Sequence, residues 1–374
     1  MSGPVMLAGG GTGGHIYPNA AIAERLIERA QGQRVAFVVS DRAVDARVRE
    51  SLSVGGADWV VSAARPLGRS VRGVLGFGIG WRRAVKAARA RYQRERPLAV
   101  VATGGFVSGP EIEAARGLGI PTALVSLDAT PGRAIRRLAP RVDRVFSAYA
   151  TLELPMAEVI GFPLRREVMV DVGVAEARER LGLDPERPVL LVTAGSQGAT
   201  TVNLGMARAL DETGLGGVLS EGGWQVLHLT GEKDVAEVSR AYVRAGVPAL
   251  ISKYKDEMGL VWRAAELAVA RPGASSVAEA WANGVPTVFL PYPFHRDEHQ
   301  RLNAEPMVAA GGAVLLRDLV RPEANAKPLK QAVCDLVRDV ERLGVMRERL
   351  MASGASDGAA VVARWVLERA GRGG

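Results

Sequence analysis

The sequence predicts an α/β protein made of two doubly wound, Rossmann-like domains. Three observations predict this fold. Short β-branched apolar runs alternate with longer helix-like segments, glycine-rich loops follow several of these runs, and the pattern restarts once near the middle of the chain. At 374 residues the chain suits two domains of ordinary size. A hydrophobic content of 48% and a charged content of 24% are typical of a globular enzyme.

The first series of apolar runs predicts the strands of an N-terminal parallel sheet. Helix-like stretches such as residues 19–30 and 81–92 lie between these runs. The predicted strands are residues 5–8, 35–39, 98–102, 122–126, 142–147 and 158–160. Glycine and proline then interrupt the pattern at GFPLRR, so we expect the first domain to cover residues 1–162.

A second series of runs predicts the sheet of a C-terminal domain over residues 163–354. Its expected strands are residues 189–193, 224–229, 249–251, 267–270, 287–290 and 313–316. A final helical segment, about residues 355–374 with its core at 359–370, is expected to pack back on the first domain.

Glycine-rich loops recur at the carboxyl ends of predicted strands, where open parallel sheets bind their ligands. They are GGGTGGH (9–15), TGGFVSGP (103–110), AGSQGA (194–199) and RPGASS (271–276). Pro110 suits the first turn of the following helix, and helices are expected from about Thr201 and after Ser276. Glycine lets backbone N–H groups approach an anion at a helix N-terminus. The repetition predicts phosphate-bearing ligands in a cleft between the domains.

The first loop also fits another function, dinucleotide binding. Gly9, Gly11 and Gly14 satisfy G-x-G-x-x-G, and Asp41 follows the second predicted strand where a ribose-binding acid would lie. A dinucleotide fingerprint opens directly into its helix, whereas we expect this helix to begin only at Pro18 or Asn19. That expectation disfavours a dehydrogenase. No Gly-Lys-Ser/Thr follows, which excludes a P-loop.

Four polar residues could carry chemistry. His15 ends the first loop, where an imidazole could remove a proton from an attacking hydroxyl or merely cap the loop. Glu279 could accept both hydroxyls of a ribose or simply complement a helix dipole. His299 and Gln300 could bind sugar hydroxyls or begin an exposed helix. His295 and His299 are four residues apart, but their surroundings do not resemble a zincin helix, so we expect no metal.

The positive charge is concentrated in one segment. Residues 65–96 carry ten Lys and Arg against one acid, a local net charge of +9, so the formal +8 of the chain arises there. Cations surround apolar side chains in this segment, as in interfacial membrane contacts. Nucleic acid would need more stacking aromatics. The predicted membrane patch consists of Val74, Leu75, Phe77, Trp81, Arg82 and Arg83.

Other features bound the location of the protein. No apolar run approaches the roughly 20 residues that cross a bilayer, and no secretory signal is evident. A single cysteine, Cys334, excludes an intramolecular disulfide and a cysteine zinc site. We therefore expect a cytoplasmic protein.

Taken together, the motifs resemble a known family. GGGTGGHIYPNAAIAERL, GGFVSGP, AGSQGA, ARPGASSVAEAWANGVP and HQRLNA occur in the order found in the MurG family of N-acetylglucosaminyltransferases. The resemblance covers nearly the whole chain and implies the GT-B fold. It also implies inverting transfer of GlcNAc from UDP-GlcNAc to the 4-hydroxyl of the muramic acid of lipid I, giving lipid II of peptidoglycan. No cofactor and no essential metal are implied, and the expected place of action is the cytoplasmic face of the cell membrane.

The resemblance also implies site residues. His15 becomes the candidate general base, and Gly104, Gly105 and Ser108 match the acceptor or diphosphate loop. The implied donor-binding residues are Thr12, Gly13, Gly14, Asp128, Arg165, Ser196, Lys255, Ala274, Ser275, Ser276, Val277, Ala278, Glu279 and Gln300.

Three positions depart from the family pattern. Asp128 replaces an asparagine that contacts the donor sugar, and a carboxylate cannot donate as an amide does. Lys255 stands where an apolar residue is usual near the uracil, and Phe162 replaces the asparagine common before Pro163. Two alternatives therefore stay open: a related transferase with another UDP-sugar or lipid acceptor, and a non-catalytic UDP-sugar-binding homologue.

Overall fold

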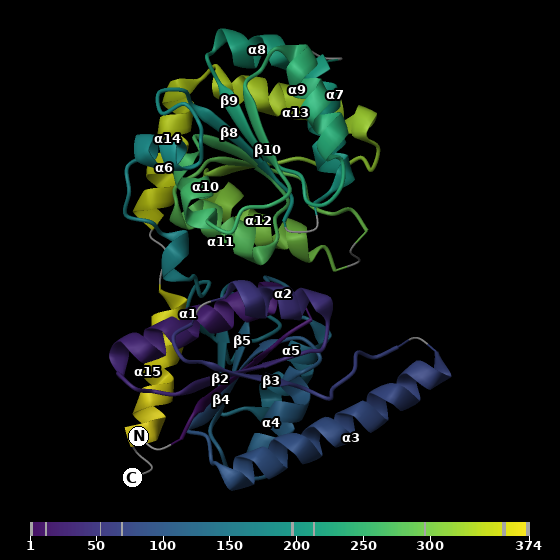
Figure 1. Cartoon of the computed structure of the whole chain (residues 1–374), viewed down its shortest axis with the longest axis vertical. Coiled ribbons are helices and arrows are strands. Elements are labelled where there is room, and N and C mark those ends of the chain that lie inside the picture. The colour runs from purple at the N-terminus through teal and green to yellow at the C-terminus, as the bar shows by residue number, and fades with distance from the viewer. Residues whose placement is uncertain are drawn as a thin grey trace. The chain divides into compact units, whose positions relative to one another are not determined.

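The chain divides into two units, which we describe separately. Unit 1 contains Met1–Arg165 and Ser356–Gly374, and unit 2 contains Arg166–Ala355. The computed structural model (Figure 1) describes residues 3–11, 13–52, 54–68, 70–195, 198–211, 214–294, 297–353 and 357–371. The side chains of residues 71–74, 370 and 371 are outside this description.

Unit 1 is built on a seven-stranded parallel sheet in the order β3-β2-β1-β4-β5-β6-β7. The strands are β1 (Val5–Gly9), β2 (Val35–Val39), β3 (Asp58–Val61), β4 (Ala99–Gly104), β5 (Thr122–Ser126), β6 (Arg144–Ser147) and β7 (Glu158–Val159). The helices are α1 (Gly13–Arg29), α2 (Ala43–Ser51), α3 (Val71–Arg94), α4 (Ser108–Arg116), α5 (Arg133–Leu138) and α15 (Gly358–Gly371).

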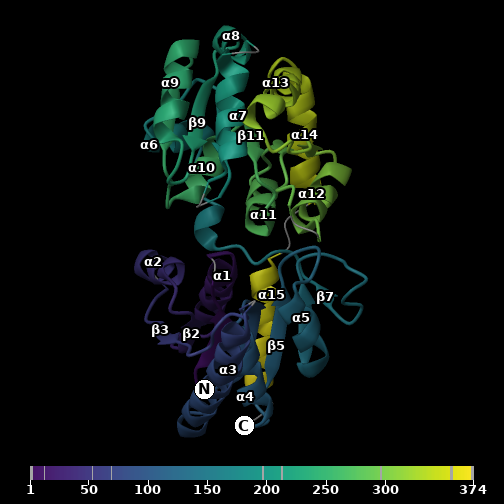
Figure 2. The same cartoon turned by 90° about the vertical axis from the view of Figure 1, so that its right-hand side faces the viewer.

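Side chains of the central strands alternate between two covered faces of this sheet. Val5 and Leu7 of β1 are buried in a cluster with α1 and α15, whereas Met6 is buried with α3, α4 and α5. Figure 2 shows these helices around the sheet. Because both faces are covered, the strands are almost continuously apolar, which is the reason that composition alone indicated them.

Unit 2 repeats the architecture with a six-stranded parallel sheet in the order β10-β9-β8-β11-β12-β13. The strands are β8 (Val189–Thr193), β9 (Gln225–Leu229), β10 (Ala249–Ser252), β11 (Leu267–Ala270), β12 (Thr287–Phe289) and β13 (Ala313–Leu315). The helices are α6 (Val174–Arg180), α7 (Thr200–Asp211), α8 (Leu215–Glu221), α9 (Val235–Ala245), α10 (Met258–Ala264), α11 (Ala274–Ala282), α12 (His299–Ala309), α13 (Pro322–Val337) and α14 (Val340–Ser353).

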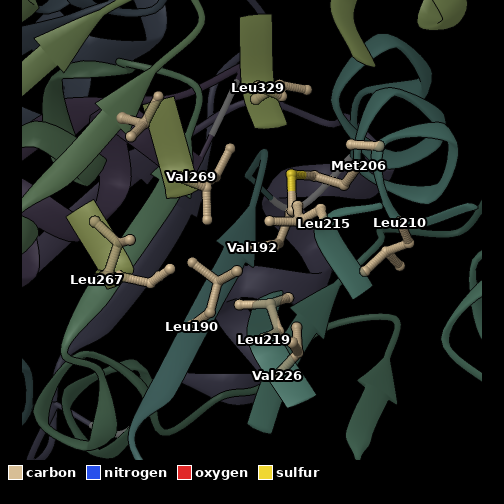
Figure 3. Close-up of a cluster of buried hydrophobic side chains, with 14 of the residues drawn as sticks. Leu190, Val192, Met206, Leu210, Leu215, Leu219, Val226, Leu267, Val269 and Leu329 are labelled. Carbon is tan, nitrogen blue, oxygen red and sulfur yellow. The ribbon is translucent and has the colours of Figure 1, made fainter. Parts of the chain in front are cut away.

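One of the two cores of unit 2 lies between its sheet and α7, α8, α9 and α13 (Figure 3). Leu190 and Val192 of β8 point toward Met206 of α7 and Leu219 of α8 in this cluster. A second cluster, on the other face, includes side chains from α6, α10, α11 and α12. The predicted α/β class with two Rossmann-like, doubly wound domains is confirmed.

The predicted start of the first helix is wrong. The sequence placed it at Pro18 or Asn19, but α1 begins at Gly13 and contains Pro18. The chain turns at Gly11, where φ is +94° and the backbone N–H donates to the buried Asp45 carboxylate at 2.9 Å. Because of this anchor, the helix begins at Gly13, five residues before Pro18. Pro18 is buried in the second turn of the helix. Because proline has no backbone N–H, the helix lacks one hydrogen bond there.

Other boundaries also differ from expectation. The sequence analysis did not include β3, and α3 begins at Val71, ten residues before the predicted start at residue 81. Glycines at 73, 76, 78 and 80 weakened the helical pattern of this segment. Strand β4 continues to Gly104, so Thr103 and Gly104 belong to the strand end and not to the following loop.

Candidate active site

His15 lies in the first turn of α1 and is bonded to the end of β4. Its Nδ1 lies 3.1 Å from the Thr103 carbonyl oxygen, and the Thr103 hydroxyl donates to the His15 carbonyl at 2.7 Å. A carbonyl oxygen only accepts, so we assign the proton to Nδ1 and the lone pair to Nε2. The ring lies against Gly104, where a Cβ would be only 2.9 Å from His15 Cε1. These contacts fix both the orientation and the tautomer of the imidazole.

Burial and nearby charges act in opposite directions on His15. Loss of solvent lowers its pKa below the usual value of 6.5 and is the largest effect. The Asp128 carboxylate, the Thr103 carbonyl and the Asp45 carboxylate each oppose this shift. The imidazole is therefore neutral at pH 7, the state in which Nε2 can accept a proton.

A buried carboxylate, Asp45 of α2, holds the first glycine loop. It accepts from the backbone N–H of Gly11 at 2.9 Å, from the Ser40 N–H at 2.8 Å and from the Ser40 hydroxyl at 2.6 Å. All of these donors are neutral, so the negative charge of Asp45 acts on its surroundings, including His15. Thr12 lies outside the described residues, Gly13 is half-buried and Gly14 is exposed.

The predicted acceptor loop is braced from within. The Ser108 side chain is fully buried, and its hydroxyl donates to the Gly104 carbonyl at 2.5 Å and lies 3.3 Å from the Ala8 carbonyl. Gly105 packs against Gly10: a Cβ at Gly105 would be 2.2 Å from the Gly10 carbonyl oxygen. The hydroxyl of Ser108 thus fixes the shape of the loop by bonding to both backbone groups of the buried Gly104, whereas Gly105 is partly exposed.

Two more predicted residues of unit 1 lie near α1. Asp128 follows β5, is half-buried and interacts electrostatically with His15. The Arg165 guanidinium lies over the Tyr17 ring, 4.3 Å from its centroid. Phe162, one of the departures from the family pattern, packs against the core that α1 and α15 share.

In unit 2 the second pair of glycine-rich loops precedes α7 and α11. Gly198, with φ of +69°, approaches the Thr230 carbonyl so closely that a Cβ would be 1.9 Å from the oxygen. Ser196 lies outside the described residues. Ala274, Ser275, Ser276 and Ala278 are partly exposed on α11, whereas the Val277 side chain is buried in the core and leaves only its backbone for binding.

Two of the other residues predicted to bind the sugar donor, Glu279 and Gln300, are fixed by hydrogen bonds. Glu279 of α11 accepts a hydrogen bond from Trp262 Nε1 at 2.8 Å, which fixes its carboxylate. Gln300 at the start of α12 accepts from the Tyr292 backbone N–H at 2.7 Å. Lys255, on the segment between β10 and α10, is half-buried.

No group of three or more His, Cys, Asp or Glu side chains that could hold a metal ion occurs within the described ranges. His295 lies outside them, and His299 Nδ1 is 2.8 Å from Asp297 Oδ1.

The predicted membrane patch lies on the N-terminal half of α3, which extends away from the sheet of unit 1 (Figure 1). Leu75 is 61% exposed, and Arg82 and Arg83 are also exposed. Ile79, another apolar residue of the basic segment, is 54% exposed. The Val74 side chain is outside the description. Among the described residues, no helix is both long and apolar enough to cross a membrane.

Trp81 does not point outward as expected for a membrane contact. It is half-buried, and its ring packs on α4 so closely that a Cβ at Gly109 would be 2.3 Å from it. Phe77 is also half-buried, with its ring centroid 5.8 Å from that of Trp81. Farther along α3, Arg91 and Tyr92 both donate to the buried Glu111 carboxylate of α4. Trp81 therefore belongs to the attachment of α3 to α4.

Known proteins match both units. Residues 5–147 match the model of the glycosyltransferase family 28 N-terminal domain, and residues 189–362 match that of the C-terminal domain. The chain is 38% identical to the UDP-N-acetylglucosamine--N-acetylmuramyl-(pentapeptide) pyrophosphoryl-undecaprenol N-acetylglucosamine transferase of Acidothermus cellulolyticus, with 94% of each chain covered. It is 34% identical to the protein of that name from Geobacter sulfurreducens, with 92% of each covered.

The chain belongs to the MurG family of glycosyltransferases.

Solved structures agree in fold. The crystal structure of Acinetobacter baumannii MurG matches with a TM-score of 0.75 and 20% identity, covering 98% of this chain and 100% of that one. The calicheamicin glycosyltransferase CalG4 matches with a TM-score of 0.65 and 17% identity, covering 100% and 99%. Membership of the MurG family excludes the dehydrogenase alternative. The late helix start, which we had taken as the reason against it, is not present in the structure.

Sequence reasoning missed several residues that hold the loops of this MurG-family site. Asp45 and Thr103 fix the His15 region, and Arg271 and Asp318 form a buried ion pair in unit 2. Arg271 had a signal, because it is the first residue of the RPGASS motif, two positions before its glycine. Asp45 and Asp318 had none, since the loop residues that they hold, Gly11 and Arg271, are 34 and 47 residues away in the sequence.

Proposed function

We propose that the protein transfers GlcNAc from UDP-GlcNAc to the 4-hydroxyl of the muramic acid of lipid I and forms lipid II. The observation that carries the proposal is His15, a neutral imidazole whose Nδ1 is committed to a carbonyl and whose Nε2 is left basic. The names of the relatives supply the substrates.

In the proposed reaction His15 acts as the general base. Its Nε2 takes the proton of the acceptor 4-hydroxyl as that oxygen attacks C1 of GlcNAc. A bond forms between O4 and C1, and the bond from C1 to the diphosphate oxygen breaks. UDP leaves with the electron pair, and attack from the opposite face inverts C1. The proton stays on His15 until solvent removes it.

We assign donor binding to unit 2. The N-termini of α7 and α11 supply backbone N–H groups and positive dipole character for the diphosphate. Glu279, fixed by Trp262, is placed to accept the ribose hydroxyls, and Gln300 to bind the GlcNAc. Arg165, Ser196 and Lys255 are further proposed contacts of the donor.

We assign acceptor binding and membrane contact to unit 1. We place the lipid diphosphate at the loop that Ser108 and Gly104 hold in shape and in which Gly105 is partly exposed. Exposed Leu75 and Ile79 with Arg82 and Arg83 fit an anionic membrane surface. The protein would thus act as a peripheral protein on the cytoplasmic face of the membrane.

One observation favours a second candidate, a transferase with another UDP-sugar. Asp128 carries a negative charge near His15 where the family pattern has an amide, and a carboxylate accepts hydrogen bonds but cannot donate them. A donor sugar with a hydroxyl in place of an acetamido carbonyl suits such a group.

Labelled UDP-sugars and a lipid I analogue separate these functions. We expect transfer from UDP-GlcNAc and little from UDP-glucose. Transfer only from another UDP-sugar would favour the second candidate, and UDP-GlcNAc binding without transfer from any donor would favour a non-catalytic homologue. Asp128→Asn is the matched variant, and a gain in GlcNAc selectivity would assign the discrimination to this position.

A further inference from the structure

A buried carboxylate at the edge of the unit 2 sheet gathers hydrogen bonds from several loops. Asp318 lies between β13 and α13 and is 3% exposed. Its Oδ2 accepts from Arg271 Nη2 at 2.6 Å and from the Thr201 hydroxyl at 2.7 Å. Arg271 Nη2 also lies 2.6 Å from the Thr201 hydroxyl oxygen, so the three side chains contact one another.

The second oxygen of the same carboxylate is bonded as well. Oδ1 accepts from the backbone N–H of Val320 at 2.7 Å and from the Asn325 side chain at 2.9 Å. Asn325 in turn accepts from the Leu319 N–H at 2.8 Å. Burial by itself raises the pKa of Asp318, but the hydrogen bonds and Arg271 outweigh it and lower the pKa, so the group is ionised at neutral pH.

These bonds join the segments that carry the proposed donor residues. Thr201 is the second residue of α7, two positions after the AGSQGA loop. Arg271 follows β11 and precedes the start of α11, and its Nη1 donates to the Leu290 carbonyl at 2.6 Å, just before Tyr292 and the segment leading to Gln300. One carboxylate therefore connects, directly or through Arg271, the starts of α7 and α11 and the segment after β12.

We infer that Asp318 is a positioning residue for the donor site. It acts through Thr201 and Arg271, and it sets the spacing of the two helix N-termini that receive the diphosphate. This inference rests on the proposed function, because it assumes that the donor binds at these loops.

The charge balance of the cluster supports this role. Arg271 lies next to the proposed diphosphate site, yet its guanidinium donates to Asp318, Thr201 and Leu290. Breaking a buried ion pair by removing one partner leaves an uncompensated charge, which rearranges its neighbours. Loss of the Asp318 charge is therefore expected to disturb Arg271 and the start of α11 together.

The test uses Asp318→Asn in the full chain, with Asp335→Asn on the exposed face of α13 as control. We expect the KM for UDP-GlcNAc to rise about tenfold or more for Asp318→Asn, since a hydrogen-bonded charge is lost, with the KM for the lipid I analogue unchanged. A merely structural residue would lower the active fraction without such a split. Equal donor KM values in both variants would overturn the inference.

A second pair of variants keeps the test decisive if Asp318→Asn does not fold. Thr201→Val removes one hydroxyl and keeps the shape, whereas Thr201→Ser keeps the hydroxyl. We expect a several-fold rise in donor KM for the valine variant and rescue by serine. Equal donor KM values for the two variants would overturn the inference.

Calorimetric titration of the wild type with UDP separates the two proposals. Absence of UDP binding would contradict the proposed function itself. Binding by the wild type with undiminished affinity in Asp318→Asn and Thr201→Val would contradict the positioning role alone.

Discussion

Each unit holds its loops with a buried aspartate, but only one of the two aspartates is paired with a positive charge. In each, one buried aspartate holds the segments at the carboxyl edge of a parallel sheet: Asp45 in unit 1 and Asp318 in unit 2. Asp45 receives hydrogen bonds from neutral donors, whereas Asp318 is paired with the Arg271 guanidinium. The charge of Asp45 is thus left to act on His15, and the charge of Asp318 is neutralised where we place an anionic donor.

The two units also differ in the charges around one histidine in each. His228 of β9 is fully buried between Tyr242 and Asn203, and burial lowers its pKa to about 3. For His15 the same effect is opposed by Asp128, the Thr103 carbonyl and Asp45. No charge opposes the lowering of the His228 pKa, whereas two carboxylates and a carbonyl oppose the lowering of the His15 pKa, which is the environment expected of a functional histidine.

The largest expected effect comes from removing the base of unit 1. His15→Ala should lower kcat by about 10²–10⁴-fold, because the acceptor hydroxyl loses its proton acceptor. UDP binding to unit 2 should be unchanged. Steady-state kinetics and calorimetric titration measure the two. An unaltered kcat would remove the base role and with it the functional contrast between the histidines.

A smaller effect is expected on the surface of unit 1. Leu75→Ser with Ile79→Ser should weaken binding to anionic liposomes about tenfold or more, since two exposed apolar side chains no longer enter the interface. Activity on a soluble acceptor should stay the same. Trp81→Ala should instead lower that activity, because its ring packs on α4 beside the Ser108 loop. The reverse pattern would show that Trp81 faces the membrane and that Leu75 and Ile79 do not.

The stability of unit 2 should depend on pH through His228. Its pKa is lower in the folded state, so the unfolded chain binds the proton first and stability falls as the pH drops from about 6.5 toward about 3. The slope should approach 1.4 kcal/mol per pH unit at most. Urea titrations followed by hydrogen exchange of β9 measure it. His228→Asn should flatten the slope, whereas Tyr242→Phe should keep it.

The smallest effect separates the two aspartates. Asp45→Asn removes a charge that raises the His15 pKa, so the acid limb of the kcat/KM profile should move to lower pH. Asp318→Asn should leave that limb in place while the donor KM rises. An equal shift of the acid limb in both variants would mean that Asp45 does not act on His15 more strongly than Asp318 does.

The strands and the glycine loops could be predicted from the sequence, because buried parallel strands are continuous apolar runs and each loop follows one. The internal supports could not. Gly11 and Asp45 are 34 residues apart, and Arg271 and Asp318 are 47 apart. A single aspartate so far along the sequence from the loop that it holds belongs to no periodic pattern or motif, so the sequence does not single it out. The start of α1 was misjudged for the same reason, since Asp45 and not Pro18 determines where the chain turns.

Helix α15 gives unit 1 a particular order of assembly. Val362 and Val366 of α15 are buried with Ile16 and Ile22 of α1, and Arg25 of α1 pairs with Asp357 at 2.8 Å. Residues 357–371 are synthesised only after all of unit 2. On the ribosome, unit 2 is therefore a continuous segment that can fold first, whereas unit 1 begins synthesis earlier and is completed later. The helix that carries His15 gains its full packing only after unit 2 has been made.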